Sequence, residues 1–187
     1  MPETILFVVV LILSIVLHEL AHGYAANWLG DPTARLAGRL TLNPIRHIDP
    51  LGSLLIPALL YFTQAPFLFG WAKPVPYNPY NLRNQRWGES FVAAAGPLTN
   101  LLLAAIFASF IRFADVFGFP PEFLQVASFI VLINIVLALF NAIPFPPLDG
   151  SKIIAPFLPF GIAQKYQALG KTLERLGFIG LFLIIFL

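Results

Sequence analysis

The sequence contains no cysteine in 187 residues, and only 11% of its residues are charged. Without cysteine the chain has no disulfide framework, and any metal site must draw its ligands from His, Asp and Glu. Soluble domains average about 25% charged residues, whereas 58% of this chain is hydrophobic and its mean hydropathy is +0.82. A net charge of +2 is too small to indicate a nucleic-acid surface. The composition is that of a membrane protein.

Five apolar runs divide the chain. Three of them, at residues 5–29, 91–114 and 123–146, are long enough to cross a bilayer core, which needs about 20 residues. The first run follows MPETILF, which lacks the basic residues that begin a signal peptide, so we expect a retained helix. The runs at 51–70 and 176–187 are interrupted or short, and the last stops in mid-pattern, as a truncated segment would.

The basic residues predict the orientation of these segments. Ten of the eleven Lys and Arg residues lie in three connections, at residues 31–49, 71–89 and 150–175. The positive-inside rule places all three connections on the cytoplasmic side and the N-terminus outside. Segment 51–70 then has both ends inside, so it must re-enter the membrane or lie at the interface. Two prolines and a glutamine within it favour the re-entrant path, and a plain spanning helix is the alternative.

The stretch ARLAGRLTLNPIRHID, residues 34–49, alternates polar and apolar side chains around its middle. A period of two predicts a short strand over about residues 36–42, ended by the Asn-Pro pair that follows. An ordinary interfacial loop would explain the same pattern nearly as well.

Three ionisable side chains lie within the first apolar run, in the sequence HELAH. His18 and His22 are four residues apart, so on a helix they differ by about 40° around the axis and about 6 Å along it. Both imidazoles can therefore reach one metal ion, and Glu19 can face the same ion and take a proton from its bound water. Each such residue costs a few kcal/mol at membrane depth, which a shared cation would offset. Polar packing between helices is the alternative.

A zinc site of this kind needs a third protein ligand, and Asp149 is the strongest candidate. It lies in NAIPFPPLDG, where three prolines end a helix and Gly150 allows close approach of the backbone. With a re-entrant segment earlier in the chain, this carboxylate reaches the same side of the membrane as the two histidines. Asn141 begins the same motif, and its amide could bind a substrate backbone or a developing oxyanion.

Other polar residues are interpreted as structural. Asn134 lies on the same helical face as Asn141, and we interpret it as a contact between helices. His47 stands among charged residues and proline, which favours an interfacial position over a ligand role. Asp31 and Asp49 are interpreted as solvated carboxylates of the first cytoplasmic connection.

As a set, these motifs resemble the site-2 protease family of intramembrane zinc metalloproteases. HELAH in a first helix, AAGPLTN in a second and NAIPFPPLDG at the end of a third occur in the order of that family. GWAKPVPYNPYN, residues 70–81, looks like the linker of compact prokaryotic members without PDZ or CBS domains, and the resemblance spans about residues 5–155. It implies one zinc ion held by His18, His22 and Asp149, with Glu19 as the catalytic glutamate and Asn141 as a residue that positions substrate.

The resemblance also implies a fold and a substrate class. We expect one multi-pass, all-α integral membrane domain over residues 1–187, with a catalytic core of three helices at about 5–29, 91–114 and 123–150. A re-entrant and linker region at 31–89 would include a short membrane-associated β element, and residues 151–187 would include a C-terminal helix. Family members cleave transmembrane segments of anchored proteins, with the active site near the cytoplasmic face. The expected partners are therefore a transmembrane substrate and the lipid bilayer of the cell, without nucleic acid.

Two other functions could use the same residues. A metal transporter or metal-binding protein would use Glu19 as a ligand, but the runs at 91–114 and 123–146 offer no His and no central carboxylate to relay an ion. An inactive family member that serves as a scaffold is disfavoured because every expected reactive residue type is present. The sequence leaves the substrate, the cleavage position and the oligomeric state open.

Overall fold

The structure, a computed structural model, describes residues 2–64 and 72–176. All regular secondary structure in these residues is helical. In chain order the elements are α1 (Pro2–Trp28), α2 (Thr33–Leu36), η1 (Pro44–His47), η2 (Pro50–Leu55), α3 (Ile56–Phe62), η3 (Pro79–Asn81), α4 (Gly88–Arg112), α5 (Ala114–Phe117), α6 (Pro121–Asn141), α7 (Asp149–Ile154), η4 (Ala155–Phe157) and α8 (Phe160–Leu176).

Three of these helices are long and apolar enough to cross a membrane, as the sequence predicts. α1, α4 and α6 contain 27, 25 and 21 residues. At 1.5 Å per residue each one spans at least about 30 Å, which is the thickness of a bilayer core. Only 28%, 33% and 22% of their most apolar windows are buried within the protein. Apolar helices that bury so little surface against protein are typical of segments surrounded by lipid.

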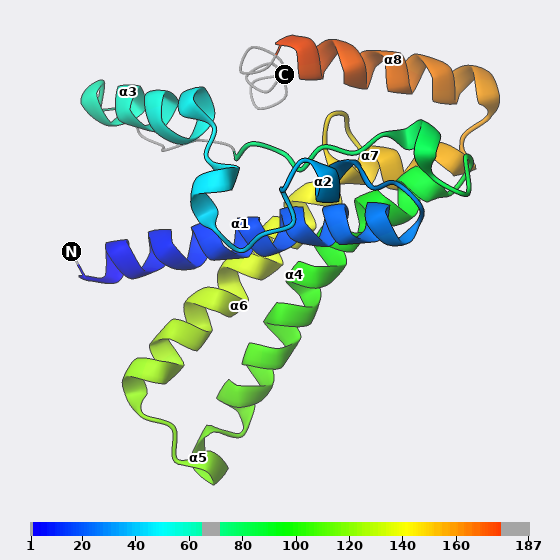
Figure 1. Ribbon diagram of the computed structural model, residues 1–187. Helices are drawn as coiled ribbons and strands as arrows, with labels where there is room; N and C mark the ends of the chain where they lie inside the picture. The colour runs from blue at the N-terminus through cyan, green and yellow to red at the C-terminus, as the bar shows by residue number, and fades with distance from the viewer. Residues whose placement is uncertain (1, 65–71, 177–187) are drawn as a thin grey trace.

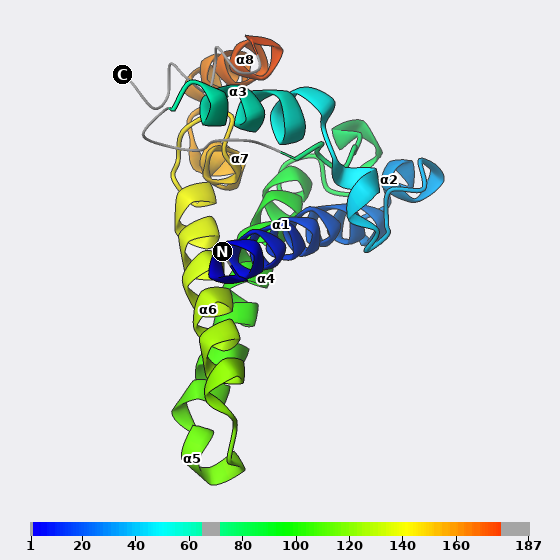
Figure 2. The same ribbon diagram turned by 90° about the vertical axis from the view of Figure 1, so that its left-hand side faces the viewer.

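The long helices meet at one end of the molecule. α4 and α6 run side by side as an antiparallel pair, joined at the far end through α5 (Figure 1). α1 packs against both of them, and the turned view shows that it crosses the pair steeply (Figure 2). α7 also packs against α4, at the end away from α5. Residues from the beginning, middle and end of the chain are therefore brought together there.

Small side chains line the contacts between these helices, and large apolar side chains cover their outside. Ala93 on α4 and Ala127 on α6 are 2% and 0% exposed, whereas Val8, Leu102 and Leu132 are 45%, 60% and 56% exposed. Small residues allow helix backbones to approach closely, which is how helices commonly pack in membranes. The close approach of α4 to α1 is what positions the site described below.

The predicted β element is not confirmed. Residues 36–42 contain the end of α2, a turn and a bend, and no strand occurs among the residues that the structure describes. The alternation of polar and apolar residues does not follow burial here, because Arg39 is 8% exposed and Leu42 is 64% exposed. The polar side chain of Arg39 is buried and donates to backbone carbonyls, so the alternation of polar and apolar residues does not mark a half-buried strand here.

The predicted re-entrant segment at 51–70 is likewise not confirmed. Its first part forms η2 and α3, which together cover residues 50–62. Thirteen residues of helix extend about 20 Å, which is too short to cross a bilayer. Residues 65–70 lie outside the described part of the chain, so the full path of this segment remains a prediction.

The predicted C-terminal helix is present as α8. It lies at the same end of the molecule as α7 and contacts η4 (Figure 1). The last apolar run, after residue 176, lies outside the described residues.

Candidate metal centre

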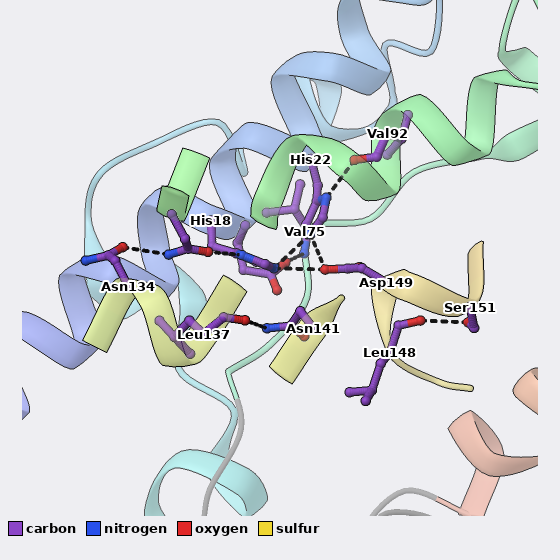
Figure 3. A network of polar contacts seen from close by, with 12 residues as sticks. His18, His22, Val75, Val92, Asn134, Leu137, Asn141, Leu148, Asp149 and Ser151 are labelled. Carbon is purple, nitrogen blue, oxygen red and sulfur yellow. Dashed lines mark hydrogen bonds and ion pairs between the residues drawn. The ribbon is translucent and has the colours of Figure 1, made fainter. Parts of the chain in front are cut away.

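The two histidines of HELAH face each other on α1. Their positions one helical turn apart bring the two Nε2 atoms within 3.0 Å. Asp149 reaches them from the first turn of α7, with its Oδ2 atom 3.1 Å from His18 Nε2 and 3.3 Å from His22 Nε2 (Figure 3). The three side chains are only 8%, 11% and 16% exposed. The structure therefore brings together the residues that the sequence predicts as metal ligands.

This cluster has the dimensions of a zinc site. A tetrahedral zinc ion with bonds of about 2.0–2.2 Å separates its ligand atoms by about 3.3–3.5 Å. The three separations are 3.0, 3.1 and 3.3 Å, so little movement is needed to surround one ion. Two imidazole nitrogens and a carboxylate oxygen are also a donor set that zinc favours when one further position is left for water. The cluster could thus hold one metal ion.

Gly96 of α4 keeps space open beside the two imidazoles. A Cβ atom at this position would lie 2.5 Å from His22 Nε2 and 2.6 Å from His18 Nε2, closer than real Cβ contacts allow. Any larger residue would therefore intrude on the nitrogens that face the candidate ion. The glycine of AAGPLTN is needed at this point of α4 for close approach to α1.

A chain of buried amides fixes the orientation of His18. His18 Nδ1–H donates to Asn100 Oδ1 at 2.5 Å, the Asn100 amide donates to Asn134 Oδ1 at 2.7 Å, and the Asn134 amide donates to Ser14 Oγ at 2.9 Å. Asn100 and Asn134 are both 0% exposed. With its proton on Nδ1, the ring presents the unprotonated Nε2 to the cluster, which is the form a metal requires. The interpretation of Asn134 as a contact between helices is confirmed.

His22 is oriented by the backbone of α4. Its Nδ1–H donates to the carbonyl oxygen of Val92 at 2.8 Å, so its Nε2 also faces the cluster. A carbonyl oxygen has two lone pairs, so Val92 O can accept this bond in addition to one from its own helix. Both ring orientations thus depend on α4.

Asp149 is presented by a tight turn between α6 and α7. Gly150 lies so close to this turn that a Cβ atom there would be 2.3 Å from Ala142 O and 2.4 Å from Ile143 O. Burial opposes ionisation of Asp149, but the positive charge that His18 and His22 carry when their Nε2 atoms are protonated holds its pKa well below the ordinary value, and a bound cation would take the place of those protons. The side chain is therefore an anion, as a cation ligand should be.

Glu19 lies next to the cluster without belonging to it. Its Oε2 atom accepts a hydrogen bond of 2.9 Å from the backbone N–H of Val75, which lies in the extended segment before α4 (Figure 3). The described side chains that could share one metal ion are His18, His22 and Asp149 alone. Glu19 is thus placed beside the candidate ligands rather than among them.

The remaining sequence-based candidates lie apart from the ligand cluster or at its edge. The Asn141 amide donates to its own helix, at Leu137 O, 2.9 Å away. His47 is only 2% exposed, its Nε2–H donates to Thr41 O, and it is not part of the ligand cluster. Asp49 accepts hydrogen bonds from two backbone N–H groups at the start of η2.

The interpretation of Asp31 as a solvated carboxylate is wrong. Asp31 is 0% exposed, and its carboxylate accepts hydrogen bonds from the side chains of Thr33 and Asn81 and from the N–H of Asn78. Burial raises its pKa, but these hydrogen bonds more than compensate and hold the pKa below the ordinary value. Asp31 ties the end of α1 to the segment before α4.

The apolar helices and the buried His-Glu-x-x-His cluster define a class. An HExxH sequence on a helix, completed by a third ligand from elsewhere in the chain, is the metal centre of zinc metalloproteases. Here that centre lies among helices long and apolar enough to cross a membrane. The class is a membrane-embedded metalloprotease.

Known proteins support the same assignment. The chain is 40% identical to a Bacillus subtilis protein named "Putative zinc metalloprotease YwhC", over 96% of this chain and 78% of that protein. It is 30% identical to a Mycolicibacterium smegmatis protein of the same description, Rip2, over 79% of this chain and 55% of that protein. No family model and no solved structure matches the chain. The chain belongs to the site-2 protease family, and zinc is its cofactor.

Proposed function

We propose that this protein is an intramembrane protease of the site-2 type, which hydrolyses peptide bonds within transmembrane segments of membrane-anchored substrates, as in regulated intramembrane proteolysis. The observation that carries the proposal is the meeting of His18, His22 and Asp149 beside Glu19, among helices that bury little of their apolar surface. A hydrolytic centre in that position is suited to substrates that are themselves embedded in lipid.

In this mechanism His18, His22 and Asp149 would hold the zinc ion, which when bound would supply an activated water and polarise the carbonyl of the peptide bond to be cleaved. Glu19 takes the proton from the attacking water and returns it to the nitrogen of the leaving amine. The hydrogen bonds from His18 to Asn100 and from His22 to Val92 keep both rings in the ligand orientation throughout.

The substrate must unwind before it can react. A transmembrane helix uses its carbonyls in i→i−4 hydrogen bonds, so a peptide bond becomes accessible only where the helix opens. We assign Asn141 to this step as a substrate-positioning residue, because it lies at the end of α6, eight residues before Asp149 in the same motif. Its side-chain carbonyl can accept a hydrogen bond from a substrate N–H while its amide donates to Leu137.

The proposed location is the cell membrane, with a single multi-pass domain over residues 1–187, the N-terminus outside and the active site near the cytoplasmic face. The distribution of Lys and Arg supports this orientation. The contact of α7 with the end of α1 that carries HELAH is consistent with it, since the basic residues of 150–175 follow directly.

Metal transport is the competing function, and it requires a path for the ion through the membrane. Along the described parts of α4 and α6, the ionisable side chains lie within the first turn or the last residue, at Glu89, Arg112 and Glu122. A central ionisable group would be needed to relay a divalent cation. Uptake of labelled zinc into proteoliposomes separates the two functions: we expect none above that of empty vesicles.

The test of proteolysis is the substitution Glu19→Gln. The variant should keep its zinc, because Glu19 is not among the candidate ligands, and it should lose cleavage of a co-reconstituted reporter with one transmembrane segment containing Gly and Pro. Glu122→Gln is the matched control, since Glu122 is exposed at the start of α6. Cleavage by Glu19→Gln at the rate of the control would contradict the mechanism.

A further inference from the structure

An extended segment lies against the metal centre and contacts its general base. We call residues 72–78 the strap; it has no helical or strand structure and contains two prolines. The N–H of Val75, in the middle of the strap, donates to Glu19 Oε2 at 2.9 Å. Figure 3 shows Val75 beside the cluster of His18, His22 and Asp149. A backbone group from a connecting segment therefore holds one oxygen of the carboxylate that the mechanism needs.

The strap is fixed on the Lys73 side by a buried arginine. Arg39 Nη2 donates to the carbonyl oxygens of Lys73 at 2.9 Å and Pro74 at 3.2 Å. Arg39 is 8% exposed, and its Nε atom has no partner among the described residues. The N–H of Lys73 donates to His47 O at 2.8 Å. Among the residues that the structure describes, this buried cation has no carboxylate partner; it is directed at two backbone carbonyls and holds this stretch of chain in place.

The other end of the strap is fixed by Asp31. Its Oδ2 atom accepts the N–H of Asn78 at 2.6 Å, and its Oδ1 atom accepts the side chain of Asn81 at 2.8 Å. The strap is thus held on both sides of Val75 by side chains from the connection that follows α1.

The Val75 side chain packs against α1 at Gly23. It is 5% exposed, and its Cγ1 atom would be 2.8 Å from a Cβ placed on Gly23, beside His22. The absence of a side chain at Gly23 leaves room for Val75 to lie close to α1, where its N–H reaches Glu19, one helical turn away. The prolines on either side lack N–H groups, so Val75 supplies the backbone donor among residues 74–76.

We propose that the strap is a positioning element for the catalytic carboxylate, in which Arg39 holds the backbone of residues 73 and 74 so that Val75 N–H orients Glu19. This inference rests on the proposed function of Glu19 as general base. With Oε2 held by Val75, the carboxylate loses rotational freedom and Oε1 is left to exchange a proton with water. Fixing a reacting group in its productive orientation lowers the activation free energy and accounts for a large part of the rate enhancement by enzymes.

The hydrogen bonds that hold the strap on both sides of Val75 distinguish a positioning element from a plug that leaves the site. A plug would have to leave the site for a substrate to enter, and the strap is bound by Arg39, His47 and Asp31 on both sides of Val75. Its carbonyls at residues 73 and 74 and its N–H at residue 73 are already bonded, so this stretch also cannot pair with a substrate as a strand edge.

The test compares Val75→Pro with Val75→Ala. Both variants lose the isopropyl group, and only proline also removes the N–H. We expect kcat for the Gly/Pro reporter to be about 10- to 100-fold lower in Val75→Pro than in Val75→Ala, as for other groups that orient residues around a metal. KM and zinc content should be equal in the two variants. Equal kcat values overturn the inference, and a higher kcat in Val75→Pro identifies the strap as a plug and overturns it too.

Arg39 provides a second pair of variants, in case Val75→Pro does not fold. Arg39→Leu removes the donors to the strap, and Arg39→Lys keeps a cationic donor of similar length. We expect kcat to fall in Arg39→Leu and to be partly restored in Arg39→Lys, without a change in zinc content. No difference between the two variants would argue against a positioning role.

Hydrogen exchange of the Val75 amide tests the contact without any activity. In zinc-loaded protein in detergent, this amide should be protected, and Glu19→Ala should speed its exchange at least about 10-fold, because a hydrogen bond to a charged acceptor is lost. Exchange that is unaffected by Glu19→Ala overturns the inference even if proteolysis is observed. If the Val75 amide is protected from exchange only when Glu19 is present, but the protein cleaves no reporter, the contact exists and the proposed function is refuted. The catalytic role of the strap is then refuted with it.

Discussion

Replacing Gly96 by alanine would place a methyl group where the imidazoles of the metal centre converge. The new Cβ would lie 2.5 Å from His22 Nε2 and 2.6 Å from His18 Nε2. Real Cβ contacts do not fall below 3.0 Å, so α4 or the two rings would have to move by about 0.5 Å. Zinc sites tolerate changes of only about 0.2 Å in ligand distance. The substitution should therefore weaken zinc binding rather than merely loosen the helix packing.

The expected size of this effect is large. Displacements that misorient ligands lower metal affinity by about 10- to 100-fold, and an intrusion on two ligand nitrogens at once should reach the upper value. A 100-fold loss corresponds to about 2.8 kcal/mol of binding free energy. The rings cannot simply turn away, because His18 is bonded to Asn100 and His22 to the Val92 carbonyl.

The assay is competition for zinc between the purified protein and a chelator of known affinity. Gly161→Ala is the matched control, since a Cβ at Gly161 would meet no atom within 4 Å. We expect wild type and the control to bind zinc equally and Gly96→Ala to bind about 100-fold more weakly. Equal affinity of the two alanine variants would refute the assignment of the ion to the space beside Gly96.

Two further predictions concern residues that support the site. Asn100→Leu removes the acceptor for His18 Nδ1–H and leaves the Asn134 amide with one fewer partner, so zinc affinity in the same competition assay should fall about 10- to 100-fold; unchanged affinity would show that the amide chain does not orient His18. Asp31→Asn should lower stability by about 2 kcal/mol at neutral pH, seen as a melting temperature about 4–8 °C lower in detergent. Because the pKa of Asp31 is held below its unfolded value of about 3.9, its contribution is complete above that pH and is lost as the pH falls through the folded pKa. The difference in melting temperature between wild type and Asp31→Asn should therefore shrink below about pH 4, and a difference that grew there would contradict this sign.

The metal ligands could be predicted from sequence because each is marked by a local pattern. HELAH puts two imidazoles on one face of a helix by spacing alone, and the three prolines before Asp149 mark the point where a helix must end. The structure places all three groups within hydrogen-bonding distance of one another. The three long helices were predictable for a similar reason, since a bilayer requires a minimum length of apolar sequence.

The groups around the ligands were not predicted, because their roles depend on tertiary contacts. Asp31 and Arg39 lie in a polar connection whose composition is that of a solvated loop, and only the fold buries them. Asn100 did carry a signal: an amide in the middle of an apolar run is expensive unless it is bonded. Gly96 showed no signal by itself, since a glycine in a helix reveals close approach only when the neighbouring helix is known.

The predicted strand failed for an identifiable reason. Its alternating pattern placed Arg39 among the solvent-facing positions, whereas the structure buries this side chain to hold the carbonyls of residues 73 and 74. The extended chain beside the metal centre is the strap at residues 72–78, where Pro74 and Pro76 exclude a regular ladder of hydrogen bonds.

The central claim is that imidazoles from α1 and a carboxylate from α7 bind one zinc ion. X-ray absorption spectroscopy of the zinc-loaded protein, wild type and Asp149→Ala, tests it most directly. In wild type we predict one zinc per chain, with two imidazole nitrogens at about 2.0–2.1 Å and oxygen ligands at about 2.0–2.2 Å. In Asp149→Ala we predict a large loss of bound zinc. A wild-type spectrum without imidazole ligands, or an Asp149→Ala variant with unchanged zinc content and coordination, would contradict the claim.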